Sequence, residues 1–133
     1  MTNLDIVKGI YEAFGRGDAG AIVERCTEDI EWEYGLVDSG VPWLRPGRGR
    51  AHALAFFQTV ATELDIEHFA VDALLAGERL VIAVCRIELI VRKTGRTVTE
   101  AAECHLWHFD DRGRVSRFRH ACDTFAHAAA WAG

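Results

Sequence analysis

The spacing of apolar residues changes once along this chain, and this change constrains the fold more than any other feature. Near the start, Ile6, Ile10 and Phe14 recur at the spacing of one helix face. At Ile30 the pattern becomes an alternation in which Ile30 and Trp32 are separated by a glutamate, as in a strand with one wet face. A chain that places helices first and a sheet afterwards is predicted to be of the α+β class.

The expected elements have recognisable ends. Thr2 and Asp5 are spaced as a capping pair for the first helix, which ends at residues 15–18. A short second helix is expected over residues 21–26, and a third over residues 50–64. Strands are expected from Ile30 and at residues 66–75, 79–92, 97–110 and 115–125.

Short turns join the later strands, at residues 77–78, 94–95 and 111–113. Links of this length connect antiparallel neighbours, because parallel strands need a long crossover. A strongly curved antiparallel sheet wrapped over helices leaves a concave side where a small molecule can bind. The sequence therefore predicts one pocket, with the glycine- and proline-rich loop 35–49 as a candidate lid.

Bulk properties exclude several classes of protein. The length of 133 residues favours a single domain spanning residues 1–133, and the net charge of −5 argues against nucleic acid as a partner. No stretch approaches the roughly 20 apolar residues of a membrane span, so no membrane partner is expected. The N-terminus lacks a signal-peptide layout, which predicts a cytoplasmic protein. The cysteines and histidines match no metal-ligand spacing, so neither a metal nor a cofactor is expected.

Segments along nearly the whole chain share one order and spacing with a known family: residues 10–14 with 17–18, 28–32, 41–43, 49–50, 56–57, 94–96, 105–110 with 113–115, and 117–119 with 123–124. Together they resemble the SnoaL-like family, which is related to the ketosteroid isomerases within the nuclear-transport-factor-like superfamily. The resemblance implies a cone-shaped fold in which three N-terminal helices pack in a strongly curved antiparallel sheet. It also implies a homodimer and a pocket for a hydrophobic small-molecule ligand.

Comparison with the ketosteroid isomerases shows that their catalytic groups are replaced in this chain. Their catalytic aspartate corresponds to Tyr34, and their strand aspartate corresponds to His105. Their helix-one tyrosine corresponds to Ile10, with Tyr11 next to it, and their supporting tyrosine corresponds to Phe57. Steroid isomerisation by that machinery is therefore not expected.

Two predicted neighbouring strands carry the polar residues that suggest chemistry. Glu103 and His105 lie on one face of their strand, and His120 shares a face with Cys122 on the next. The turn at residues 111–113 makes these strands hairpin partners, so the two imidazoles are expected to lie close together. The family resemblance indicates that this face lines the pocket.

These side chains suggest acid–base catalysis, since an imidazole with a pKa of about 6.5 can take and give a proton near neutral pH. His120 is the candidate general base, and Glu103 can orient a histidine. Tyr34 and His105 can donate hydrogen bonds to a developing oxyanion. Asp123 is out of phase with His120 and is kept because some family members use an acid near this point. Alternatively, the polar groups only satisfy one another.

The function predicted from sequence is that of a cofactor-independent isomerase, cyclase or dehydratase acting on a hydrophobic carbonyl-containing substrate. The alternative is a non-catalytic ligand-binding or dimeric interaction module of the same fold. Trp43 suits either a lid over the pocket or the core. The residues expected to line the substrate site are Trp32, Trp43, Phe57, Cys85, Trp107, Phe118 and Cys122.

Overall fold

Helix α1 (Asn3–Gly15) begins at the predicted capping pair. In the computed structural model, which describes residues 1–133, the Thr2 hydroxyl accepts a hydrogen bond from the Asp5 amide at 3.1 Å. The Asp5 carboxylate accepts one from the Thr2 amide at the same distance. Helix α2 (Ala19–Val23) follows after a turn and is capped by Asp18. It ends earlier than predicted, because Cys26 already belongs to the first strand.

The six strands form one sheet in the order β2-β1-β6-β5-β4-β3. All neighbouring strands are antiparallel except β1 and β6, which run parallel. The parallel pair brings the end of the first strand beside the last strand, although the two are far apart in sequence. The strands are β1 (Cys26–Trp32), β2 (Gly47–Arg48), β3 (Leu64–Ala76), β4 (Leu80–Val91), β5 (Thr97–Phe109) and β6 (Val115–Ala121).

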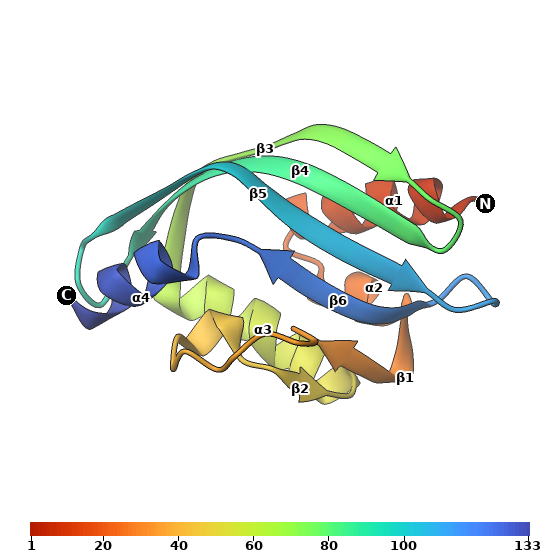
Figure 1. The fold of residues 1–133 in the computed structure, drawn as a ribbon, viewed down its shortest axis with the longest axis horizontal. Coiled ribbons are helices and arrows are strands. Elements are labelled where there is room, and N and C mark those ends of the chain that lie inside the picture. Colours follow the sequence, from red (N-terminus) through yellow and green to blue (C-terminus); the bar gives the residue numbers. More distant parts are fainter.

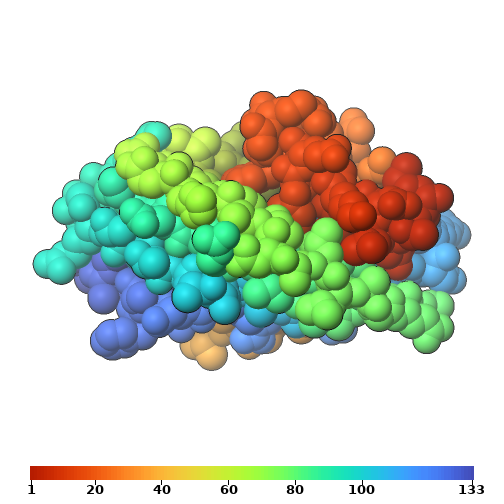
Figure 2. Space-filling view, turned by 90° about the horizontal axis from the view of Figure 1, so that it is seen from above, coloured from red at the N-terminus to blue at the C-terminus, as the bar shows by residue number.

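The sheet curls around the helices. In Figure 1, β3, β4 and β5 arch over the interior, and α3 (Arg50–Glu63) crosses on the opposite side, next to β1 and β2. Seen from above in Figure 2, the atoms of α1 (red) lie against those of β3 (yellow-green). The loop between β1 and β2 contains a 3-10 turn, η1 (Pro42–Leu44). None of the helices is long and apolar enough to span a membrane.

The C-terminal segment differs from the sequence-based prediction, which extended the last strand to residue 125. Strand β6 ends at Ala121, and a fourth helix, α4 (Thr124–Ala132), follows. The Asp123 carboxylate caps this helix by accepting a hydrogen bond from the Ala126 amide at 3.0 Å. The segment is rich in alanine, the residue with the highest helix propensity, so the cap is enough to end the strand and begin a helix. In Figure 1, α4 lies at the C-terminal end of the molecule.

The β5–β6 hairpin has the predicted register. His105 and His120 are directly opposite one another, and both side chains are buried on the concave side. Their ring centroids are 4.9 Å apart. The expectation that the two imidazoles turn inward together is therefore confirmed.

We predict that Asp123→Ala lowers the free energy of unfolding by about 1 kcal/mol, because it removes the side-chain cap of α4. Urea denaturation followed by circular dichroism measures this change. Asp111→Ala is the matched control, since Asp111 is exposed and its side chain makes no hydrogen bond within the protein. An equal loss in both variants would contradict the assigned role of the cap.

Candidate active site

A cavity of about 80 Å³ lies inside the curl of the sheet. Hydrophobic side chains make up 17 of the 21 lining residues. Electrostatic interactions between groups inside the cavity are therefore stronger than they would be in bulk water. The other four lining residues are Glu103, His105, His120 and His127, and Tyr11, one of the 17, adds a hydroxyl group.

Glu33 and His120 form a buried pair at this cavity. One Glu33 oxygen accepts a hydrogen bond from the backbone amide of His120, and the other accepts one from its ring Nδ1, both at 2.7 Å. Glu33 is 0% exposed and His120 is 8% exposed. Burial alone would lower the pKa of His120, but the charge and hydrogen bond of Glu33 raise that pKa above its ordinary value.

Glu33 owes its position to an unusual backbone conformation. It is the only residue other than glycine with a positive φ, at 54°, and such a conformation is strained for a side chain with a Cβ. Backbone hydrogen bonds hold it, from the Glu33 amide to the Phe118 carbonyl and from the Leu36 amide to the Glu33 carbonyl. The chain turns at Glu33, directly after β1, and the alternation of buried and exposed side chains stops there. Trp32 and Glu33 are therefore both fully buried.

Tyr34 consequently lies outside the cavity, and the prediction that it lines the pocket is wrong. Its hydroxyl bonds to Nε2 of His108 at 2.5 Å, and the guanidinium of Arg117 covers its ring. The sequence-based prediction assumed a regular strand through residue 34. The positive φ at Glu33 shifts the alternation of inward and outward side chains by one residue. The Glu33 side chain therefore takes the inward position that a regular strand would give to Tyr34.

The protons around His105 can be placed by elimination. Trp107 Nε1 donates a hydrogen bond to the Tyr11 hydroxyl oxygen at 3.0 Å. The Glu103 carboxylate can only accept, so the ring proton of His105 lies on Nε2, from which it is donated to Glu103 at 2.6 Å. In the neutral ring Nδ1 is then an acceptor, and the Tyr11 hydroxyl donates its own proton to it at 2.6 Å.

The electrostatics agree with this assignment. Burial lowers the pKa of His105, which keeps the ring neutral near neutral pH, and burial raises the pKa of Tyr11 well above its usual value. Burial would also raise the pKa of Glu103. The hydrogen bond from His105 and the charge of His120 outweigh this, so the pKa of Glu103 is lowered.

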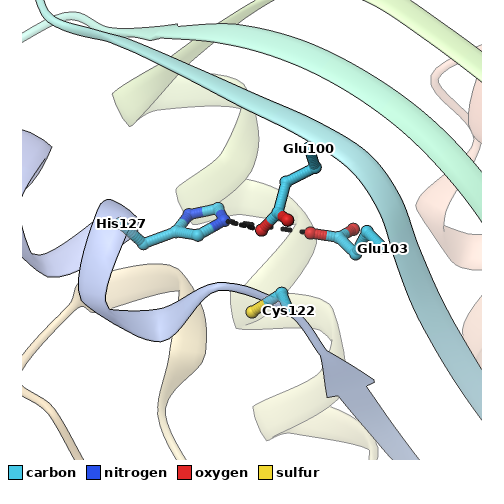
Figure 3. A group of neighbouring side chains, drawn as sticks. All are labelled: Glu100, Glu103, Cys122 and His127. Atoms are coloured by element: carbon cyan, nitrogen blue, oxygen red, sulfur yellow. Dashed lines mark hydrogen bonds and ion pairs between the residues drawn. The ribbon is translucent and has the colours of Figure 1, made fainter.

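A second buried group extends this network toward α4 (Figure 3). Trp43 Nε1 donates to His127 Nδ1 at 2.9 Å, so the proton of His127 lies on Nε2. That nitrogen points at Glu100, 2.9 Å away, with an oxygen of Glu103 at 3.8 Å. Cys122 lies beside the group, and burial raises the pKa of its thiol. Glu103 is thus placed between two imidazoles.

Two sets of these side chains are close enough to surround a metal ion: Glu100, Glu103, Cys122 and His127, and Glu103, His105 and His120. The hydrogen-bond assignment argues against this use, because the nitrogens of His105 and His127 that face the carboxylates carry protons. A metal ion binds only the deprotonated nitrogen, and it binds a thiolate rather than a thiol. The donor set as arranged therefore fits a hydrogen-bonded network. The absence of a metal site stays a prediction.

The structure brings most of the predicted site residues together. Cys85 lies behind the wall, with its sulfur 3.8 Å from His105 Nδ1, and Cys122 lies beside His127. Asp123 is outside the cavity because it caps α4. Trp43 is buried in the wall and is not an exposed flap. The predicted residues that line the cavity are Trp32, Trp43, Phe57, Glu103, His105, Trp107, Phe118 and His120.

Sequence reasoning missed Tyr11, Glu33, Glu100 and His127 as parts of the site. Glu100 and Glu103 are three residues apart, which places them on opposite faces of a regular strand. A bulge in β5 removes this conflict, since Cys85 is opposite Glu103 whereas Ile87 is opposite Glu100. Tyr11 was within reach of sequence reasoning, because it is next to the position of the family's helix-one tyrosine.

The comparisons with known proteins agree with the fold. The sequence matches the SnoaL-like domain family over residues 7–118. An NTF2-like protein of Burkholderia thailandensis E264 is similar in structure, with 28% identity, a TM-score of 0.83 and 98% of both chains covered. An NTF2-like protein of Burkholderia xenovorans LB400 has 26% identity and a TM-score of 0.80, with 96% of this chain and 94% of that chain covered.

TerC co-crystallised with polyporic acid shares 21% identity, with a TM-score of 0.79 and 98% of both chains covered, and so supports the fold alone. A comparison with curated proteins gave no significant match.

We predict that Glu33→Gln lowers the pKa of His120 by about 1 unit or more, because it removes the charge that offsets burial. NMR titration of the imidazole carbon-bound protons measures this value. Glu31→Gln is the matched control, since Glu31 pairs with Arg48 at the protein surface.

The free energy of unfolding depends on pH through the protonation of His120. The pKa of His120 is raised in the folded protein above its ordinary value of 6.5. Its stabilisation is thus fully present below pH 6.5 and is lost as the pH rises through the folded-state pKa. The loss of stability in Glu33→Gln should therefore be largest below pH 6.5 and smaller above the folded-state pKa. A difference that grows with pH would contradict the pairing.

Proposed function

The chain belongs to the SnoaL-like domain family, and on that premise we propose that it is a cofactor-independent enzyme using acid–base chemistry. The reaction class is that of an isomerase, cyclase or dehydratase, which removes a proton next to a carbonyl group. The substrate is hydrophobic, because the cavity is lined mainly by apolar side chains.

One observation carries this proposal, namely the free nitrogen of His120. Both ring nitrogens of His105 are engaged within the protein, by Tyr11 and Glu103. Both nitrogens of His127 are engaged too, by Trp43 and Glu100. In His120, only Nδ1 is hydrogen-bonded within the protein, to Glu33. Its Nε2 is therefore the one imidazole nitrogen at the cavity that can contact a substrate.

The pair of Glu33 and His120 has the arrangement of an oriented general base. Neutral His120 takes a proton from the substrate carbon at Nε2, while its Nδ1–H stays on the Glu33 carboxylate. Glu33 fixes the tautomer and stabilises the imidazolium that forms. The same imidazolium then returns the proton to another position of the enolate, which completes an isomerisation. The raised pKa of His120 keeps both protonation states accessible near neutral pH.

His105 has a supporting role in this proposal rather than that of an oxyanion donor. Its Nε2 proton is already given to Glu103. Its ring meets that of His120 edge to face, with centroids 4.9 Å apart, and so limits the motion of His120. The negative charge of Glu103 favours the imidazolium of His120. The Tyr11–His105–Glu103 chain thus positions the base and tunes it.

A second candidate is a ligand-binding module without catalysis, which is favoured by the internal pairing of most polar groups. TerC, co-crystallised with polyporic acid, supports the use of this fold as a small-molecule pocket in either case. Homodimerisation and a cytoplasmic location remain proposals.

We predict that the protein accelerates deuterium incorporation next to the carbonyl of small ketones in D₂O, with cyclohexanone and acetophenone as first substrates. His120→Gln should reduce the NMR exchange rate by about 100-fold or more, the range of a lost general base. Glu33→Gln should give a smaller loss. His108→Gln is the matched control, because that ring bonds to Tyr34 outside the cavity.

Circular dichroism checks that the variants fold. Exchange that survives in His120→Gln would contradict the assigned base. Ketone binding without any exchange in the wild type would favour the binding module.

A further inference from the structure

A groove with a volume of about 700 Å³ lies between α1 and β3. These are the two elements whose atoms lie against each other in Figure 2. Lys8, Glu12 and Ala73 at its rim are exposed, so the groove is open to solvent. We call it the outer groove, to distinguish it from the cavity that contains His120. Its hydrophobic lining comes from both elements: Tyr11, Phe14, Phe69, Val71, Ala73 and Leu74.

The outer groove and the cavity share a wall. Tyr11, Phe14 and Phe69 line both spaces, and all three side chains are partly buried. Their rings pack together, with the centroid of Phe69 5.4 Å from that of Phe14 and 6.0 Å from that of Tyr11. The two spaces are therefore separated by a single layer of aromatic side chains.

This shared wall is close to the proposed base. The ring centroids of Tyr11 and Phe69 are 5.9 Å and 6.4 Å from that of His105. The His105 ring is in turn 4.9 Å from that of His120. A substituent on a ring bound at His120 therefore has to span only about the width of one imidazole to reach the wall.

The cavity by itself has room for about one ring. A buried water needs roughly 10–15 Å³ of such space, so about 80 Å³ corresponds to several water molecules. The outer groove is several times larger and adjoins the cavity through the shared wall. It thus provides adjoining space for the rest of a longer substrate.

The charges at the outer groove indicate the chemistry of that remaining part. Lys8 and Glu12 are four residues apart on α1, so a positive and a negative charge lie on one face of the helix. Asp72 on β3 is already paired with Arg86, through hydrogen bonds of 2.8 Å and 3.1 Å. These charges cancel, so the groove has no excess charge for an ionic group. Its hydrophobic side chains favour an uncharged hydrocarbon chain.

We propose that the cavity and the outer groove form one continuous binding site for a substrate with two parts. A flat ring that bears the carbonyl group occupies the cavity at His120, and an uncharged hydrocarbon tail occupies the outer groove. The tail passes between the rings of the shared wall, where Phe69 belongs to the edge strand β3. The inference rests on the proposed function for the placement of the carbonyl group at His120, whereas the tail subsite concerns binding alone.

The test compares the binding of acetophenone and 4-butylacetophenone by ligand-observed NMR titration. Wild type should bind 4-butylacetophenone at least 5-fold more tightly, because each carbon in a groove open on one side adds about 2-fold, half the free energy of full burial. Ala73→Trp places a large side chain in the groove and should reduce this ratio below about 2-fold. Ala76→Trp is the matched control, since Ala76 is exposed on the same strand outside the groove, and it should keep the wild-type ratio.

A charged tail of similar length tests the chemistry of the groove. The probe 4-(4-acetylphenyl)butanoic acid should bind wild type more weakly than 4-butylacetophenone, because its carboxylate would lose water without gaining a cationic partner. Binding as tight as that of 4-butylacetophenone would overturn the assignment of a hydrocarbon tail.

The outcomes are distinguishable from those of the function itself. A wild-type ratio below 5-fold, or one that persists in Ala73→Trp, overturns the tail subsite and leaves ketone exchange by His120 intact. A wild type that prefers the tailed ketone but exchanges no deuterium contradicts the proposed function and still supports the subsite.

Should Ala73→Trp not fold, intermolecular NOEs in the wild type provide the second readout. The terminal methyl group of 4-butylacetophenone should show NOEs to Val71 and Leu74 in the outer groove, and its acetyl group should show them to Phe118 in the cavity. A terminal methyl group that contacts neither Val71 nor Leu74 would overturn the proposal.

Discussion

The buried pair of Glu33 and His120 is the interaction on which the site depends. Removing two ionisable groups from water is costly, and a buried pair is retained only when its geometry and hydrogen bonds are good. Here Glu33 accepts two hydrogen bonds from one residue, at its backbone amide and its ring. The parallel pairing of β1 with β6 sets Trp32 opposite Phe118, so Glu33, the first residue after β1, can reach His120. The positive φ of Glu33 directs its side chain toward His120.

Three histidines at one cavity differ in chemistry because their partners differ. A carboxylate on Nδ1 favours the charged form of His120, whereas burial and a tyrosine hydroxyl keep His105 neutral. An indole N–H fixes the tautomer of His127. These partners come from α1, η1, β5 and the turn after β1, so distant parts of the fold together set the state of the three rings. The consequence is one free imidazole nitrogen, on His120, in an apolar space.

The sequence predicts the architecture well because periodicity and turn chemistry are local signals. The helices, the long strands and the facing of His105 and His120 follow from them, and the family resemblance supplies the cone shape. Two of the exceptions come from breaks in regular strand geometry. The positive φ at Glu33 exchanges it with Tyr34, and the bulge in β5 turns Glu100 inward. Helix α4 was missed because an alanine-rich tail carries little amphipathic pattern, so His127 had no visible partner. Such irregularities depend on tertiary contacts, and they gather here at the site.

The most direct test of the account is a neutron crystal structure of the deuterium-exchanged protein near pH 6, which locates the protons themselves. The account predicts deuterium on both ring nitrogens of His120, with Nδ1–D directed at Glu33, and on Nε2 alone of His105. A His120 ring without deuterium on Nδ1, or one whose Nε2 is bonded to another protein group, would contradict it.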